Sequence, residues 1–153
     1  MQLRRSSARV LPVDREGRAL LQLARGLLPR GDRRWLTIGG GLKPGETLAE
    51  AAARELREET GITVEPAALG RPLGSTVIRY IAFGVLPVAD YLTYFAVAVD
   101  EAELSFAHQS RLERLTIQAH EWLTAEELER RPERLTDEEL PRMIRAAAAA
   151  VRA

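Results

Sequence analysis

The sequence contains no cysteine, which excludes disulfide bonds, thiolate metal sites and cysteine nucleophiles. This absence fits a reducing cytoplasm, where we expect the protein to reside. The chain also lacks a net charge, because 22 lysines and arginines balance 22 aspartates and glutamates. A neutral chain has no overall electrostatic attraction to nucleic acid or to an anionic membrane. Any chemistry on a charged ligand must therefore be local to a site.

Long hydrophobic runs are lacking as well. Residues 1–17 contain two adjacent arginines with no apolar run behind them, so we expect no secretory signal and no segment that spans a bilayer. The chain has 153 residues, of which 46% are hydrophobic and 29% charged. These values suit a single domain over residues 1–153 with one sizeable core. The sequence leaves open whether the protein is a monomer or a homodimer.

β-branched, aromatic and alternating residues predict the strands of a mixed sheet. The polar residues 14–17 form a turn between the first two strands, residues 86–90 a hairpin turn, and residues 62–75 a strand, turn and loop. Residues 26–34 and 101–111 are expected to be loops. The other predicted strands lie at residues 6–13, 18–25, 35–41, 76–85, 91–100 and 115–123.

Capping signals predict the helices. Thr47 and Glu50 are spaced as a capping box at the start of a helix over residues 47–60, and Gly61 follows its end. Thr124 with Glu127, and Thr136 with Glu139, predict two later helices, the second of which reaches the end of the chain. These elements indicate an α/β (α+β) domain with one glutamate-rich helix in the middle and one helix at the end.

Glu55, Glu58 and Glu59 share one face of the central helix, because residues three and four apart are neighbours. Like charges at these spacings destabilise a bare helix by about 0.2–0.5 kcal/mol per pair. One interpretation is a solvated acidic face that is relieved by neighbouring arginines such as Arg54. The other is a cation site.

Two features favour the cation site. The helix follows three glycines, Gly39 to Gly41, where the backbone can come close to a ligand because no Cβ intervenes. The three carboxylates also adjoin an apolar side that includes Ala52 and Leu56, and such a cluster is costly unless a cation lies among the charges. Oxygen ligands of this kind suit Mg²⁺ or Mn²⁺.

The same residues resemble a known family. Gly40, five residues, Glu46, seven residues and then the run from Arg54 to Ile62 match the fixed positions of the Nudix box. The resemblance extends to "EGRALLQLAR" and "RRWLTIGGGLKPGE" before the helix and to "HEWLTAEEL" late in the chain. One departure is Ile38, where the family commonly has proline. The resemblance implies a Nudix-type α/β/α sandwich with a mixed central sheet, a box loop and helix, and a C-terminal helix.

The resemblance also implies a function. Nudix hydrolases cleave a nucleoside diphosphate linked to another group, by attack of water on a phosphorus of the pyrophosphate. Glu58 and Glu59 would be the central ligands of Mg²⁺ or Mn²⁺, and Glu55 a further ligand or the base. A carbonyl of Gly39 or Gly40 would complete the shell. Arg54 would hold a glutamate by charge-assisted hydrogen bonds. Glu46 would stabilise the junction between loop and helix.

Members of the family often supply one more acid from outside the box. Glu121, just before Trp122, is the preferred residue, and Glu113 is the alternative. His120 neighbours Glu121 on a predicted strand, so the two side chains should face opposite ways. We interpret His120 as structural or exposed.

The substrate is less defined. Tyr80 lies 18 residues after Ile62, a spacing that is similar to that of Nudix enzymes acting on dinucleoside polyphosphates. Arg79, Tyr80 and Phe83 are candidates for a base pocket formed by stacking, although core or surface packing also explains them. A second function remains open, that of a Nudix-fold module that binds nucleotides without cleaving them. Such modules usually lose box glutamates, whereas this box is complete.

Overall fold

The computed structural model describes residues 1–26, 31–99, 104–105 and 109–152. Within these ranges the strands are β1 (Leu3–Val13), β2 (Ala19–Arg25), β3 (Arg33–Leu36), β4 (Ile38–Gly41), β5 (Gly74–Ala82), β6 (Leu86–Ala98), β7 (Ile117–Leu123) and β8 (Arg134–Leu135). The helices are α1 (Leu48–Thr60), the 3₁₀ helix η1 (Pro66–Leu69), α2 (Arg111–Thr116), α3 (Ala125–Glu129) and α4 (Leu140–Arg152). No helix in the described ranges has the length and apolarity needed to cross a membrane.

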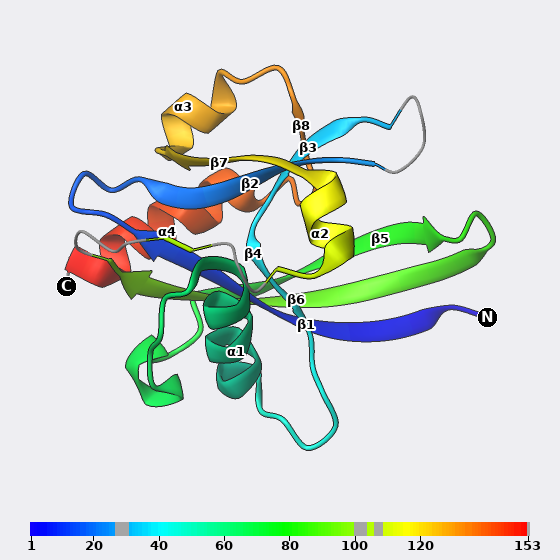
Figure 1. Cartoon of the computed structure of the whole chain (residues 1–153), viewed down its shortest axis with the longest axis horizontal. Coiled ribbons are helices and arrows are strands. Elements are labelled where there is room, and N and C mark those ends of the chain that lie inside the picture. The colour runs from blue at the N-terminus through cyan, green and yellow to red at the C-terminus, as the bar shows by residue number, and fades with distance from the viewer. Residues whose placement is uncertain (27–30, 100–103, 106–108, 153) are drawn as a thin grey trace.

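The described strands form one curled, mixed sheet with the order β5-β6-β1-β2-β3-β8 (Figure 1). β1 runs parallel to β6, and β3 parallel to β8, while the other pairs are antiparallel. β4 pairs with β1 and β7 pairs with β2, so both lie off the main path. The sequence prediction of a mixed sheet with helices is confirmed.

β1 changes partner along its length, and this change positions the glycine segment. Its end pairs with β2 at Val13 and Ala19, whereas its middle pairs with β4, where Ala8 lies opposite Gly40. β4 therefore lies beside the long β1–β6 pair and leads through a short loop into α1. The glycines and the first turns of α1 are held against the centre of the sheet as a result.

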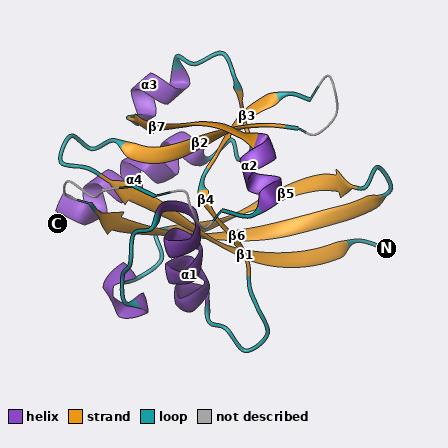
Figure 2. Cartoon of the chain, in the orientation of Figure 1, coloured by secondary structure: helices purple, strands orange, loops and turns teal. Residues whose placement is uncertain are grey.

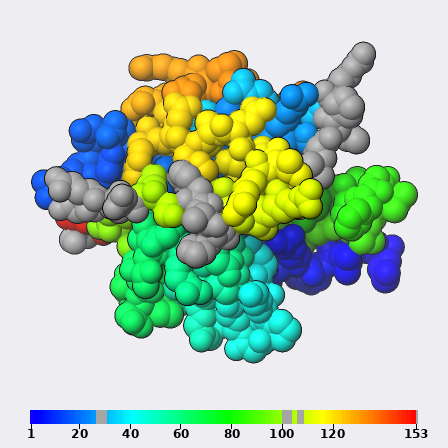
Figure 3. All heavy atoms as spheres, in the orientation of Figure 1, coloured from blue at the N-terminus to red at the C-terminus, as the bar shows by residue number. Residues whose placement is uncertain are grey.

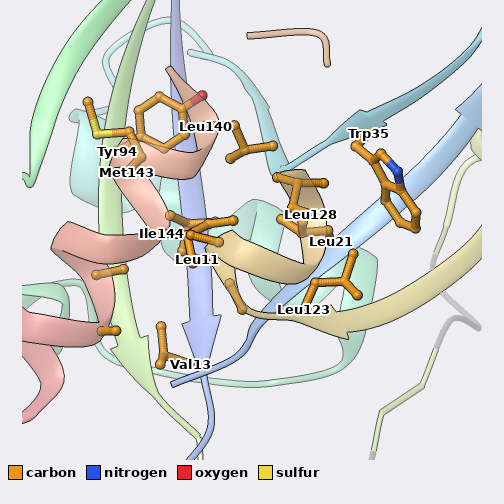
Figure 4. Packing of buried hydrophobic residues seen from close by; sticks show 14 of the residues in the cluster. Leu11, Val13, Leu21, Trp35, Tyr94, Leu123, Leu128, Leu140, Met143 and Ile144 are labelled. Atoms are coloured by element: carbon orange, nitrogen blue, oxygen red, sulfur yellow. The ribbon is translucent and has the colours of Figure 1, made fainter. Parts of the chain in front are cut away.

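Helices cover both faces of this sheet, as expected for an α/β/α sandwich (Figure 2). On one face α3 and α4 pack over a buried cluster that includes Leu11, Trp35, Tyr94, Met143 and Ile144 (Figure 4). On the other face α1 buries its alanines and Leu56 against side chains of β1 and β6. The acidic side of α1 thus belongs to one defined face of the sheet.

The caps of α1 agree with those predicted from the sequence. The Thr47 hydroxyl accepts a hydrogen bond from the Glu50 N–H at 3.1 Å, and the Glu50 carboxylate accepts one from the Thr47 N–H at 3.0 Å. Gly61 ends the helix in the left-handed conformation, with a φ of 78°. The helix thus begins and ends where its local signals place it.

The predicted hairpin turn at residues 86–90 is wrong, because these residues belong to β6. The turn lies at Phe83 and Gly84, which have φ values of 54° and 75°. The Val85 N–H donates to the Ala82 carbonyl at 3.1 Å and closes the turn. Two successive positive φ values match the two-residue hairpin turns that suit the strand twist. Gly84 carried this signal in the sequence.

Other elements also differ from the sequence prediction. The predicted strand over residues 35–41 is divided into β3, which begins at Arg33 in the predicted loop, and β4. Residues 62–64 form no strand, and the chain passes directly to η1. Residues 111–116 form α2, which was not predicted. α4 begins at Leu140, later than predicted. In the turn before it, the Asp137 side chain rather than that of Thr136 accepts a hydrogen bond from the Glu139 N–H, at 3.0 Å. The predicted strand end at Asp100 lies outside the described residues.

Candidate active site

Arg54 is the centre of a network that joins the glycine loop to α1. Its guanidinium donates to both carboxylate oxygens of Glu46 at 2.7 and 2.9 Å, and to Glu55 at 2.8 Å. It also donates to Glu58 at 3.3 Å and to the Gly41 carbonyl at 3.2 Å. One planar cation therefore holds three carboxylates that would otherwise repel each other.

Glu46 lies at the junction between loop and helix, as expected. Its carboxylate accepts a hydrogen bond from the Lys43 N–H at 2.9 Å in addition to those from Arg54. The Arg54 hydrogen bond is the largest cause that lowers the pKa of Glu46 to about 2, and the same bond raises the pKa of Arg54. Glu46 remains ionised over the whole physiological range and fixes the loop to the helix.

The glycine segment forms a cradle for the carboxylates of α1. Gly39 has a φ of 148°, and a Cβ there would lie 2.1 Å from the Ala8 carbonyl oxygen. The Gly39 N–H donates to the Glu59 carboxyl at 3.0 Å. A Cβ on Gly40 would lie 2.5 Å from Glu55 Oε1. Side chains are excluded at both positions because backbone or carboxylate fills the space.

Glu59 is buried, with only 4% of its surface exposed. Burial raises its pKa to about 10, and a hydrogen bond with Glu113 and the charge of Glu55 act in the same direction. Burial also raises the pKa of Glu55, against the opposing hydrogen bond from Arg54. A buried group of acids in this state is one that a cation would stabilise strongly.

Glu113 reaches this cluster from α2. Burial favours a higher pKa for Glu113, but hydrogen bonds from Glu59 and Ser110 outweigh it, so the pKa is lowered. The Ser110 N–H donates to Glu113 at 2.9 Å, and the Ser110 hydroxyl accepts from the Glu113 N–H at 3.2 Å. This capping box fixes the acid at the start of α2. Figure 3 shows the α2 and α1 segments on the same face of the molecule.

Glu121 does not join the cluster. Its carboxylate accepts two hydrogen bonds from Arg131, at 2.9 and 2.8 Å, which lower its pKa. Arg131 lies over the Trp35 ring, on the face of α3 and α4, whereas Trp122 packs on the α1 face. Neighbours on a strand alternate, so Glu121 points to the face opposite α1 while Trp122 points toward α1. The geometry favours Glu113 over Glu121, the opposite of the order drawn from the sequence.

His120 shares the α1 face with Trp122, two residues along the same strand. It is half-buried, and its ring lies 3.4 Å from the Gln22 side-chain nitrogen. Burial lowers its pKa. The interpretation of His120 as a structural residue agrees with this packing.

Arg79, Tyr80 and Phe83 do not gather into one pocket. Arg79 and Tyr80 are consecutive on β5 and therefore face opposite sides of the sheet. Phe83 lies at the hairpin turn with 95% of its surface exposed. Arg79 shares the face of the sheet that α1 covers. It lies opposite Ala89 on β6, and Ala89 is on the same side of β6 as Phe95, which packs in the cluster with α1.

The donor set fits a hard divalent cation. It consists of carboxylate oxygens, which such cations prefer, and the glycine at position 40 keeps the space near Glu55 free of side chains. Among the residues that the structure describes, no group of three or more His, Cys, Asp or Glu side chains is arranged to hold a metal ion as it stands. Arg54 donates to one oxygen of each of two carboxylates, Oε1 of Glu55 and Oε2 of Glu58.

Comparison with known proteins identifies the family of the chain. A family model described as the NUDIX domain matches residues 3–145. The chain belongs to the Nudix family. The resemblance drawn from the box is thereby confirmed.

Two curated relatives match parts of this Nudix chain. Nudix hydrolase 3 of Caenorhabditis elegans is 38% identical over 55 residues, which cover 36% of this chain and 23% of that protein. Phosphatase NudJ of Escherichia coli K12 is 35% identical over 98 residues, which cover 64% of this chain and 56% of the relative. The matched segments thus span less than two thirds of either relative.

Solved structures share the fold. The MutT protein from Methanosarcina mazei Go1 superposes with a TM-score of 0.66 at 21% identity, over 99% of this chain and 98% of that one. A Caenorhabditis elegans Ap4A hydrolase in a binary complex gives a TM-score of 0.60 at 18% identity, over 97% and 98% of the two chains. At these identities the likeness establishes the fold.

Proposed function

We propose that this protein is a divalent-metal-dependent hydrolase that cleaves the pyrophosphate bond of a nucleoside diphosphate linked to another moiety. The observation that carries this proposal is the convergence of Glu55, Glu58 and Glu59 with Glu113 beside the glycine cradle. The names of the curated relatives, a Nudix hydrolase and a phosphatase, support it. A module that only binds nucleotides would not need this complete set of acids.

Each acid has a proposed role. Glu55, Glu58 and Glu59, with a carbonyl of Gly39 or Gly40, would hold Mg²⁺ or Mn²⁺. The bound cation would neutralise phosphate charge and lower the pKa of a coordinated water. Arg54 orients Glu55 and Glu58 through its hydrogen bonds and does not need to touch substrate.

Glu113 is the proposed proton acceptor from outside the box. It shares a hydrogen bond with Glu59 and is the more acidic of the two, because its own pKa is lowered while that of Glu59 is raised. An ionised carboxylate next to the site can accept a proton from an attacking water. Glu113 is therefore a candidate general base, and Glu121, which is bound to Arg131, is not.

A substrate panel tests the proposal. Nucleoside triphosphates, sugar nucleotides and dinucleoside polyphosphates are incubated with the protein in Mg²⁺, in Mn²⁺ and in excess EDTA, and the products are separated by anion exchange. The account predicts cleavage of at least one class to a nucleoside monophosphate and a second phosphorylated product, and no cleavage in EDTA. Binding without cleavage would instead support the nucleotide-binding module.

A further inference from the structure

Arg54, the arginine of the acid cluster, is already engaged by carboxylates. Its guanidinium donates to Glu46, Glu55 and Glu58 and to the Gly41 carbonyl. A polyphosphate that enters this region needs positive groups beyond bound metal ions. Arginines on the same face of the sheet that have no carboxylate partner can supply this positive charge.

Strand register identifies such arginines. Gly40 lies opposite Ala8 on β1, and Ala8 belongs to the core under α1. Because side chains alternate along a strand, Arg4 shares that face with Ala8. Arg4 lies opposite Ala89 on β6, and Ala89 lies opposite Arg79 on β5. The two arginines therefore form one row across three strands, on the face that carries the glutamates.

The Arg4 side chain lies over the Tyr91 ring on this face. Its guanidinium carbon lies 4.7 Å from the centre of the Tyr91 ring. Tyr91 is in register with Ser6, two residues closer to the Gly40 row than Arg4 itself. The backbone of Tyr91 is thus two residues, about 7 Å at roughly 3.3 Å per residue, from the Gly40 row. Stacking on an aromatic ring holds the planar group and leaves its N–H edge free to donate.

Within the described ranges, no carboxylate lies at ion-pair distance from Arg4 or Arg79, whereas Arg5, on the opposite face, lies 3.6 Å from Asp90. Both Arg4 and Arg79 are exposed. The ends of β1, β5 and β6 that carry them extend beyond α1 (Figure 1).

We propose that Arg4, held on Tyr91, and Arg79 bind a further phosphate of the substrate, beyond the anhydride that is cleaved. The substrate class is then a nucleotide with three or more phosphates in line, which the guanidinium fork can engage by paired hydrogen bonds. This inference rests on the proposed function, because it uses the acid cluster as the site of cleavage. Arg4 and Arg79 determine specificity and take no part in the cleavage itself.

Calorimetric binding in Mg²⁺ tests the proposal without turnover at the α,β bond. The probes are the α,β-methylene analogues of ADP and ATP, which differ by one terminal phosphate. Arg4→Ala should raise the dissociation constant of the ATP analogue about tenfold, the scale of one charge-assisted contact. It should raise that of the ADP analogue by no more than about twofold. Tyr91→Ala should show the same selective loss, and Tyr91→Phe, which keeps the ring, should not.

Arg5→Ala is the matched control, because Arg5 is the neighbouring arginine on the opposite face. Melting curves establish that each variant is folded. Equal losses in Arg4→Ala and Arg5→Ala, or a parent that binds both analogues equally or binds neither, would overturn the proposal. A parent that binds with the expected selectivity but hydrolyses nothing in the substrate panel would refute the proposed function and leave the phosphate site supported.

Discussion

Arg54 allows several carboxylates to lie close together in the absence of a bound cation. Its contacts to Glu46, Glu55 and Glu58 replace mutual repulsion with charge-assisted hydrogen bonds. The sequence predicted that Arg54 holds a glutamate. It could not show that one arginine holds three, because that depends on how the loop folds back onto α1.

The pairing of Glu46 with Arg54 should make the protein sensitive to acid. The pKa of Glu46 is about 2 in the folded protein and 4.5 as its ordinary value. A lowered pKa stabilises the fold above pH 4.5, and the contribution is lost as the pH falls toward 2. Urea denaturation at pH values from 7 to 2 measures the free energy of unfolding. In Glu46→Gln, the decrease of this free energy between pH 7 and pH 2 should be smaller than in the parent by about 1–2 kcal/mol, allowing for solvent screening. An unchanged slope in the variant would contradict the assignment.

The identity of the extra acid gives a second prediction at this scale. Glu113→Gln should lower kcat about 10²-fold or more, the usual effect of removing a positioned acid or base. Glu121→Gln should lower it less, because Glu121 is bound to Arg131 on the other face of the sheet. Steady-state rates at saturating substrate and metal compare the two variants. The reverse order of effects would return the role to Glu121.

Among the helices and strands, those whose ends are marked by nearby residues could be predicted from the sequence. The start and end of α1 follow from Thr47, Glu50 and Gly61, which lie within the helix or beside it. The hairpin turn and α2 were missed although Gly84 and the Ser110–Glu113 box carry local signals. The direction of Glu121 could not be predicted from alternation alone, because alternation does not say which face of the sheet α1 covers.

The glycine cradle makes a prediction about the loop before α1. Gly40 has no positive φ, so its backbone tolerates alanine, but the new Cβ would lie 2.5 Å from Glu55 Oε1. Gly40→Ala should displace Glu55 and lower kcat about 10²-fold, since a shift of about 1 Å has that effect. Gly41→Ala is the control, because the atoms nearest to its Cβ would belong to the flexible Arg5 guanidinium, the first at 3.2 Å. Similar rates in the two variants would count against the cradle.

At the scale of the whole molecule, an equal number of positive and negative charges conceals a strongly acidic patch. The folded protein pays to bury Glu59 and to gather its neighbours, and a cation that binds only the folded state should recover stability by mass action. Mg²⁺ at about 100 times its dissociation constant should stabilise the fold by about 2.7 kcal/mol. Melting temperatures with and without Mg²⁺ measure this effect. Equal shifts in the parent and in a variant with glutamine at positions 55, 58 and 59 would indicate a general salt effect.

The central claim is that the acids of α1 form a hydrolytic metal site. The most direct measurement is the Mg²⁺-dependent turnover of Glu58→Gln with the best substrate of the panel, beside Glu65→Gln as an exposed glutamate outside the cluster. We expect Glu58→Gln to melt like the parent and to lose most of its turnover, because one ligand charge is removed without a change of shape. Glu65→Gln should keep the parental rate. A folded Glu58→Gln that hydrolyses the substrate at the parental rate would contradict the account.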